Sequence, residues 1–80
     1  MSDISRLRWQ CRRGMRELDI LLERYLQRDF PAAGQAEKSA FCALLELQDP
    51  ELAGYLLRDV AHPDAVSRRV IERILGAVDG

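Results

Sequence analysis

The strongest constraint on the fold is an apolar stripe with helical spacing between residues 15 and 29. Its members recur at the i, i+3, i+4 and i+7 positions that share one face of an α-helix. They are Met15, Leu18, Leu21, Leu22, Tyr25 and Leu26. The other faces hold mostly charged side chains, so this helix must bury one side against other elements. In a chain of 80 residues those elements must be short.

Similar patterns predict four more helices, over 4–13, over 35–48, from 49 to a point between 58 and 61, and over 65–78. Asp49 and Pro50 give the clearest start signal, because Asp is a favoured N-cap and Pro fits the first helical position. Glycine is scarce and β-branched residues cluster only near the end, which argues against a sheet. We predict one all-α domain over residues 1–80, a compact antiparallel bundle of five short helices with a break at Gly14 between the first two. Its core should include Leu18, Leu22, Phe41, Leu45 and Ile74.

Charge is unevenly distributed along the chain. Residues 1–16 hold five arginines against Asp3 alone, whereas residues 31–60 hold two basic and five acidic residues. The net charge is −1, so we do not expect nucleic-acid binding; a dipolar surface can instead orient a protein partner. No apolar run approaches the length of a membrane span, so we expect no membrane insertion. Polar and charged residues follow Met1 directly, so we expect no signal peptide and a cytosolic protein.

The sequence shows no arrangement of side chains that is typical of catalysis or metal binding. His62 is the only histidine and precedes a proline, which indicates a loop or capping residue. Cys11 and Cys42 lie far apart among apolar neighbours, so we expect two reduced core thiols and no metal site. Glu17 and Asp19 are two positions apart, so on a helix they point to different sides and cannot act as a carboxylate pair. We predict no enzymatic activity.

A packed core does not explain the stretch from Cys11 to Asp19. Gly14 interrupts the helical pattern, and glycine tolerates backbone conformations and close approaches that other residues resist. One interpretation is a solvated helix start with weak surface ion pairs. The other is a docking surface in which Arg13 clamps a carboxylate or carbonyl group of a partner and Glu17 orients that arginine or contacts the partner. Since Arg13 and Glu17 lie off the apolar stripe, we expect their replacement to leave the stability nearly unchanged.

The same stretch, Trp9-x-Cys11-Arg12-Arg13-Gly14-Met15-Arg16-Glu17-Leu18-Asp19, resembles the signature of the succinate dehydrogenase assembly factor family. The Arg-Gly-x-x-Glu motif of that family falls on Arg13, Gly14 and Glu17. A second block, Leu44-Leu45-Glu46-x-x-Asp49-Pro50-x-Leu52, is also similar, and the resemblance spans nearly the whole chain. We therefore predict a partner-binding surface formed by Trp9, Arg12, Arg13, Gly14, Arg16, Glu17, Asp19 and Ile20.

The resemblance implies a bacterial cytoplasmic factor that binds the flavoprotein subunit of succinate dehydrogenase, with fumarate reductase as a further target. Such a factor promotes covalent attachment of FAD as a non-catalytic chaperone. The FAD then belongs to the partner, and we expect no tight FAD site and no catalytic or metal-binding residue in this chain. We expect the free protein to be a monomer. Some similar proteins are labelled antitoxins of a toxin–antitoxin pair, which is the alternative function.

Overall fold

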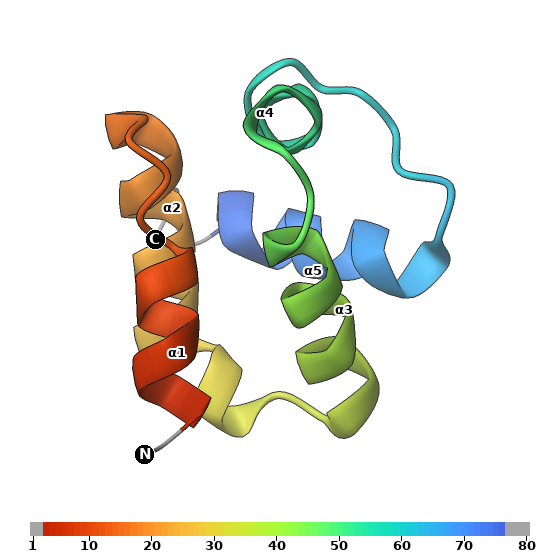
Figure 1. The fold of residues 1–80 in the computed structure, drawn as a ribbon. Helices are drawn as coiled ribbons and strands as arrows, with labels where there is room; N and C mark the ends of the chain where they lie inside the picture. Colours follow the sequence, from red (N-terminus) through yellow and green to blue (C-terminus); the bar gives the residue numbers. More distant parts are fainter. Residues whose placement is uncertain (1–2, 77–80) are drawn as a thin grey trace.

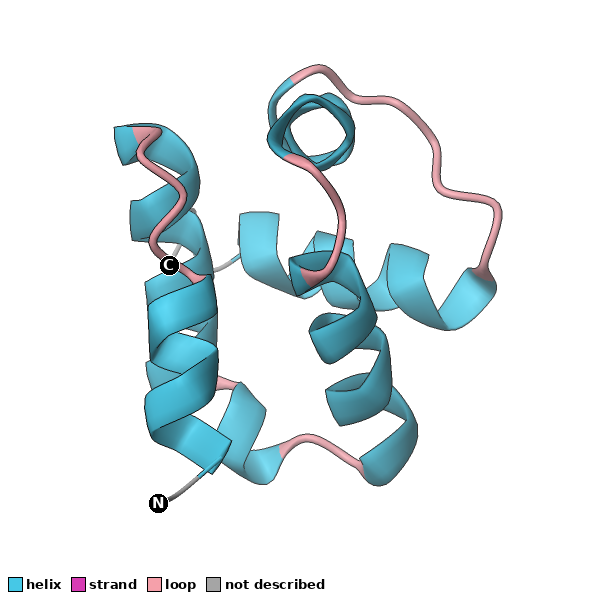
Figure 2. Ribbon diagram, in the orientation of Figure 1, coloured by secondary structure: helices cyan, strands magenta, loops and turns pink. Residues whose placement is uncertain are grey.

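The computed structural model describes the backbone of residues 3–76 and the side chains of residues 5–76. Its helices are α1 (Asp3–Gln10), α2 (Arg16–Arg28), α3 (Gln35–Leu45), α4 (Asp49–Leu57) and α5 (Ala65–Gly76), with a 3₁₀ turn η1 (Phe30–Ala32) after α2 (Figure 1). Every regular element of the described chain is helical (Figure 2). The prediction of five short helices in an all-α domain is confirmed.

The first three helices run in alternating directions, α1 and α2 side by side and α3 opposite them (Figure 1). Helices α4 and α5 lie across this group, and α4 is seen end-on in the same view. Helix α5 packs against α2, α3 and α4, so it closes the core from one side, whereas α1 contacts α2 and α3. The connection between α1 and α2 and the one between α3 and α4 both lie at the upper end of the domain in this view.

The core is built from the apolar faces of all five helices. Its largest fully buried side chains are Tyr25, Phe41, Leu18, Leu22, Leu44, Leu52, Ile74, Val70 and Cys11. The aromatic rings meet at its centre: Phe41 lies with its ring centroid 4.6 Å from that of Tyr25 and 5.6 Å from that of Phe30. All five residues predicted for the core are buried. The end of the helix predicted over 65–78 lies outside the described residues.

One member of the α2 stripe is wrongly assigned. Met15 is exposed, because it precedes the first helical turn and its backbone is extended, with φ −108° and ψ 110°. The buried face of α2 therefore begins at Leu18 and continues through Leu22, Tyr25 and Leu26. The stripe identifies the helix correctly, but its first member is the N-cap residue, one position before the helix begins.

The segment between α4 and α5 holds the single histidine in a loop, as predicted. The ring of His62 lies 4.6 Å from that of Tyr55, and its Nδ1 accepts a hydrogen bond from the backbone N–H of Asp64. Asp64 in turn accepts a 2.9 Å bond from the N–H of Ser67 in the first turn of α5, and the hydrogen bonds from Ser67 lower the pKa of Asp64. None of the described helices is long and apolar enough to cross a membrane.

The core assignment can be tested on neighbouring positions of α2. Leu22 is fully buried, so Leu22→Ala should lower the free energy of unfolding by about 2–5 kcal/mol, because it removes apolar contacts and leaves a cavity. The matched control is Ile20→Ala, two residues away on an exposed face, which should change it by no more than about 0.5 kcal/mol. Urea unfolding followed by circular dichroism measures both. Equal losses in the two variants would show that the register of α2 is wrong.

Candidate functional site

The turn between α1 and α2 is built around Gly14. Helix α1 ends at Gln10, and the N–H of Cys11 still donates to the carbonyl of Leu7 at 3.0 Å. Gly14 then adopts φ +85°, a left-handed conformation in which side chains are strained. A Cβ at this position would meet nothing within 4 Å, so the turn is also open on its outer side. The predicted break is confirmed, but the first helix ends three residues earlier than expected.

The side chain of Arg13 turns inward from this loop. Its Nη1 donates to the carbonyl of Leu45 at 2.7 Å and to that of Gln10 at 3.1 Å, and its Nη2 donates to the carbonyl of Leu47. Its Nε donates to Oδ1 of Asp49 at 2.8 Å. Only 12% of the side chain is exposed. Arg13 therefore binds the end of α1, the end of α3 and the start of α4 at once, and a cation is favourable near helix C-terminal carbonyls.

Asp19, in the first turn of α2, also holds the loop in place. Its Oδ1 accepts a 2.7 Å hydrogen bond from the backbone N–H of Arg13, while its own N–H donates to the carbonyl of Met15. A carboxylate in the first turn of α2 also lies near the positive end of that helix. We call this network the Arg13 clamp. Its members are Arg13, Gln10, Asp19, Leu45, Leu47 and Asp49.

The clamp explains two differences between the predicted and observed helices. Asp49 is not the N-cap of α4: Gln48 holds that position without a side-chain cap bond, and the carboxylate of Asp49 binds Arg13 instead. Helix α3 ends at Leu45 and not at residue 48, and the carbonyls of Leu45 and Leu47 accept from Arg13. Arg13, which is distant in sequence, therefore binds the groups at the end of α3 and the start of α4 to which local capping rules assign other roles.

The structure bears on two expectations about the motif. Glu17 does not orient Arg13: its carboxylate is exposed and takes part in no hydrogen bond or ion pair among the described residues, whereas Asp49 and Asp19 bind Arg13. The structure also argues against the expectation that Arg13 can be replaced without loss of stability, because its guanidinium donates four hydrogen bonds within the chain. Among the eight predicted site residues, all of which the structure describes, only Arg13 and Asp19 are joined by a hydrogen bond to a side chain; the backbone N–H of Arg12 also donates to the carbonyl of Trp9.

The other six predicted site residues lie at the surface around the turn. We call them the turn surface: Trp9, Arg12, Gly14, Arg16, Glu17 and Ile20. Trp9 is 76% exposed and Ile20 is 46% exposed, so two large apolar side chains face solvent beside charged ones. Glu17 and Ile20 are three positions apart on α2 and share one face of that helix. Trp9 and Arg12 are also three positions apart, on either side of the end of α1. Exposed aromatic and arginine side chains are typical of protein interfaces.

The two thiols are in different environments. Cys11 is fully buried, and burial raises the pKa of its thiol to about 12, so it stays protonated at neutral pH. This confirms the prediction of a core thiol at Cys11. Cys42 is only half-buried, at the edge of the core, which corrects its assignment as a core residue. Among the described residues, no cluster of His, Cys, Asp and Glu side chains could hold a metal ion.

The comparisons with known proteins agree with each other. A family model described as the flavinator of succinate dehydrogenase matches residues 5–78, which include the Arg13 clamp and the turn surface. The FAD assembly factor SdhE of Coxiella burnetii is 42% identical over 69 residues, which are 86% of this chain and 84% of that protein. The protein of the same name in Pectobacterium atrosepticum is 39% identical over 70 residues, covering 88% and 80%. That of Haemophilus ducreyi is 35% identical over 81 residues, covering 99% of both chains.

Neighbouring arginines test the clamp. Arg13→Ala should lower the free energy of unfolding by about 1.5–3 kcal/mol, because it leaves a carboxylate and partly buried carbonyls without their charged donor. Arg12→Ala removes the same charge from an exposed position and should cost no more than about 0.5 kcal/mol. Thermal and urea unfolding measure both variants. If Arg13→Ala were as stable as Arg12→Ala, the clamp would contribute nothing to the fold.

Proposed function

Because this chain belongs to the succinate dehydrogenase flavinator family, we propose that it binds the flavoprotein subunit of that enzyme and promotes covalent attachment of FAD. The resemblance in the Arg-Gly-x-x-Glu motif agrees with the family match over most of the chain. No observation on the described residues favours the antitoxin alternative.

The exposure of Glu17 indicates that the turn surface is the docking site. Its carboxylate faces solvent and has no intramolecular partner among the described residues, unlike the guanidinium of Arg13. Gly14 leaves an open approach next to it, since a Cβ placed there would meet no atom within 4 Å. Arg13 contributes indirectly, because its hydrogen bonds hold the turn between α1 and α2 against α3 and α4. In this arrangement Glu17, Trp9 and Ile20 contact the flavoprotein, and Arg13 and Asp19 position them.

The chain then acts on the conformation of its partner and supplies no reacting group. Its buried thiol has a pKa of about 12, and its one histidine is held in a loop by Tyr55 and Asp64. Binding energy can instead favour the flavoprotein conformation in which the flavin and the attacking side chain are aligned. Such a factor needs a rigid contact surface, because a pre-ordered surface loses less conformational entropy on binding.

The FAD, in this proposal, remains with the flavoprotein. The helix N-terminus nearest the motif is that of α2, and its first turn carries Glu17 and Asp19. Helix N-termini attract phosphate through free N–H groups and a positive dipole end, whereas carboxylates at that position repel it. The residues around Gly14 therefore do not fit the diphosphate of a flavin nucleotide.

We further propose that the free factor is a monomer in the bacterial cytoplasm and that fumarate reductase is a second target.

The carboxylate of Glu17 provides the direct test. Glu17→Ala should fold with an unchanged melting temperature, because the side chain is exposed, yet fail to restore covalent flavin in cells that lack the wild-type factor. The readout is in-gel flavin fluorescence of the dehydrogenase flavoprotein. Glu72→Ala is the matched control, an exposed glutamate on α5, and should restore normal fluorescence. Full fluorescence with Glu17→Ala would contradict the docking role of the turn surface.

A further inference from the structure

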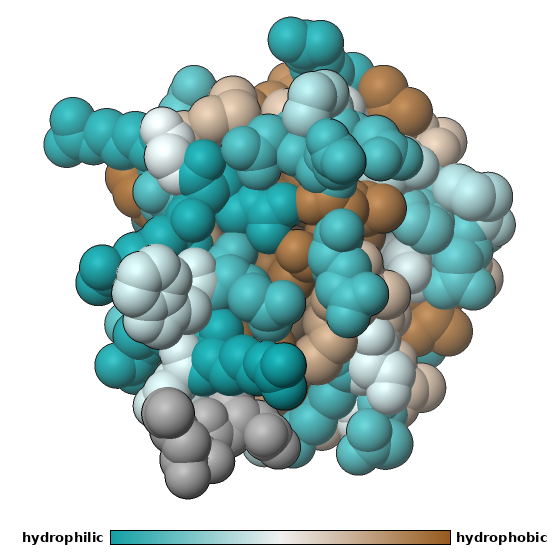
Figure 3. Space-filling model, in the orientation of Figure 1, coloured by the Kyte–Doolittle hydropathy of each residue, from teal (hydrophilic) through white to brown (hydrophobic). Residues whose placement is uncertain are grey.

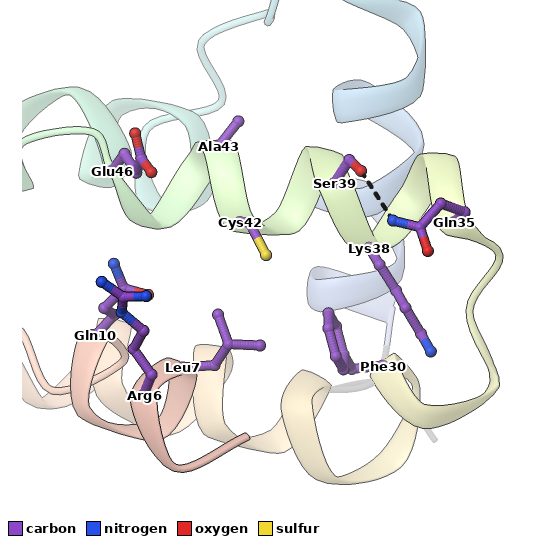
Figure 4. A pocket seen from close by; sticks show the side chains of 10 residues that line it. All are labelled: Arg6, Leu7, Gln10, Phe30, Gln35, Lys38, Ser39, Cys42, Ala43 and Glu46. Atoms are coloured by element: carbon purple, nitrogen blue, oxygen red, sulfur yellow. Dashed lines mark hydrogen bonds between the residues drawn. The ribbon is translucent and has the colours of Figure 1, made fainter. Parts of the chain in front are cut away.

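A second surface feature lies outside the turn surface, in the groove between α1 and α3. It has a volume of about 830 Å³. The close view in Figure 4 shows Leu7 from α1 and Phe30 from η1 pointing into the space, and the sulfur of Cys42 pointing into it from α3. We call these three side chains the groove floor. In the space-filling view, hydrophobic atoms are visible between hydrophilic ones over this part of the molecule (Figure 3).

Two cations border the groove without a carboxylate partner. Arg6 stands on the α1 side and Lys38 on the α3 side (Figure 4), and among the described residues neither forms an ion pair. In contrast, Arg13 is paired with Asp49 and Arg73 with Glu37. The amino group of Lys38 lies 5.4 Å from the centroid of the Phe30 ring, so the cation sits directly beside the apolar floor. Glu46 is the one acidic residue among the described residues that line the groove, so the lining keeps an excess of positive charge. This combination fits a ligand that carries both an apolar side chain and carboxylates.

The length and position of the groove fit a segment of polypeptide. Its α3 wall runs from Gln35 to Glu46, about 16 Å at the rise of an α-helix. An extended chain covers that length with about five residues. One end of the groove adjoins the Arg13 clamp: the side chain of Gln10 lines the groove while its carbonyl accepts from Arg13, and Glu46 follows Leu45, another acceptor of the clamp. A partner bound at the turn surface can therefore continue into the groove.

We propose that this groove holds an extended acidic segment of the flavoprotein, which places an apolar side chain on the groove floor and carboxylates on Arg6 and Lys38. The inference rests on the proposed function, since the flavoprotein is the partner it names. Polar side chains along both walls complete the site. Gln10 and Gln35 present amide groups that can bond to the main chain of an extended segment, and Gln35 already donates to Ser39 at 3.3 Å.

Affinity for the purified flavoprotein subunit tests the groove by substitution. Lys38→Glu should weaken binding at least tenfold, because it opposes the incoming carboxylate. Its control is Arg69→Glu, with the same charge change on an exposed position of α5, which should stay within twofold. Ala43→Trp fills the groove from an exposed position of α3 and should also weaken binding at least tenfold, whereas Ala36→Trp, on the same helix but outside the groove, should not. Isothermal titration calorimetry gives the affinities, and melting temperatures verify folding.

Glu17→Ala in the same titration separates this inference from the proposed function. If Glu17→Ala loses binding while Lys38→Glu and Ala43→Trp bind like the wild type, the groove is not part of the interface and the inference is wrong, although the proposed function stands. If the wild-type chain does not bind the flavoprotein at all, the proposed function fails and the inference falls with it.

Cys42 supplies an independent probe of the same surface. Its half-buried thiol faces the groove, whereas Cys11 is fully buried with a pKa of about 12 and should not compete for an alkylating reagent. Iodoacetamide modification of Cys42, followed by mass spectrometry of the intact chain, should slow at least fivefold when saturating flavoprotein is added. An unchanged rate in the bound state would overturn the inference. The rate of Cys42 modification is also measured without flavoprotein at rising concentrations of the chain itself. If the rate falls there, a second copy of the chain covers the groove, and the inference is overturned.

Discussion

The position of one guanidinium group determines how the upper end of this domain is assembled. Arg13 donates to carbonyl oxygens at the ends of α1 and α3 and to the carboxylate of Asp49 at the start of α4. Helix ends leave carbonyl groups without intrahelical partners, and leaving such groups unpaired inside a protein is costly. A single arginine can satisfy several of them because its donors form a rigid planar fork. The turn between α1 and α2 is thereby fixed against the connection between α3 and α4, which lies 32 to 36 positions away in sequence.

This arrangement divides the Arg-Gly-x-x-Glu motif into parts with different physical roles. Arg13 is 12% exposed and bonded within the chain, so it acts on the fold. Gly14 permits the left-handed backbone that turns the chain from α1 into α2. Only Glu17 presents its functional group to solvent, on the face of α2 that also exposes Ile20. A surface held in this way is ordered before a partner arrives, which reduces the entropic cost of docking.

Much of the fold could be predicted from the sequence because helical periodicity is a local signal. The stripe through Leu18, Leu22 and Leu26 identifies α2 and its buried face without knowledge of any other element. The clamp could not be predicted in this way, since Arg13 and Asp49 are 36 positions apart and no local pattern joins them. Local rules therefore assigned Asp49 to a cap and left Arg13 open between a solvated position and a partner-binding role. One signal in the sequence pointed to the contact: Arg13 and Asp49 lie in the two sequence blocks that resemble the family.

The Arg13–Asp49 bond joins the turn between α1 and α2 to the start of α4, and a double-mutant cycle measures its contribution to stability directly. The free energies of unfolding are determined for the wild type, Arg13→Ala, Asp49→Ala and the double variant under identical conditions. Since the two side chains are joined by a 2.8 Å charged hydrogen bond, we expect a coupling energy of about 1 kcal/mol or more. In that case, the double variant will be more stable than the sum of the single losses predicts. Strictly additive losses would instead show that Arg13 and Asp49 stabilise the domain independently and that the bond between them contributes nothing.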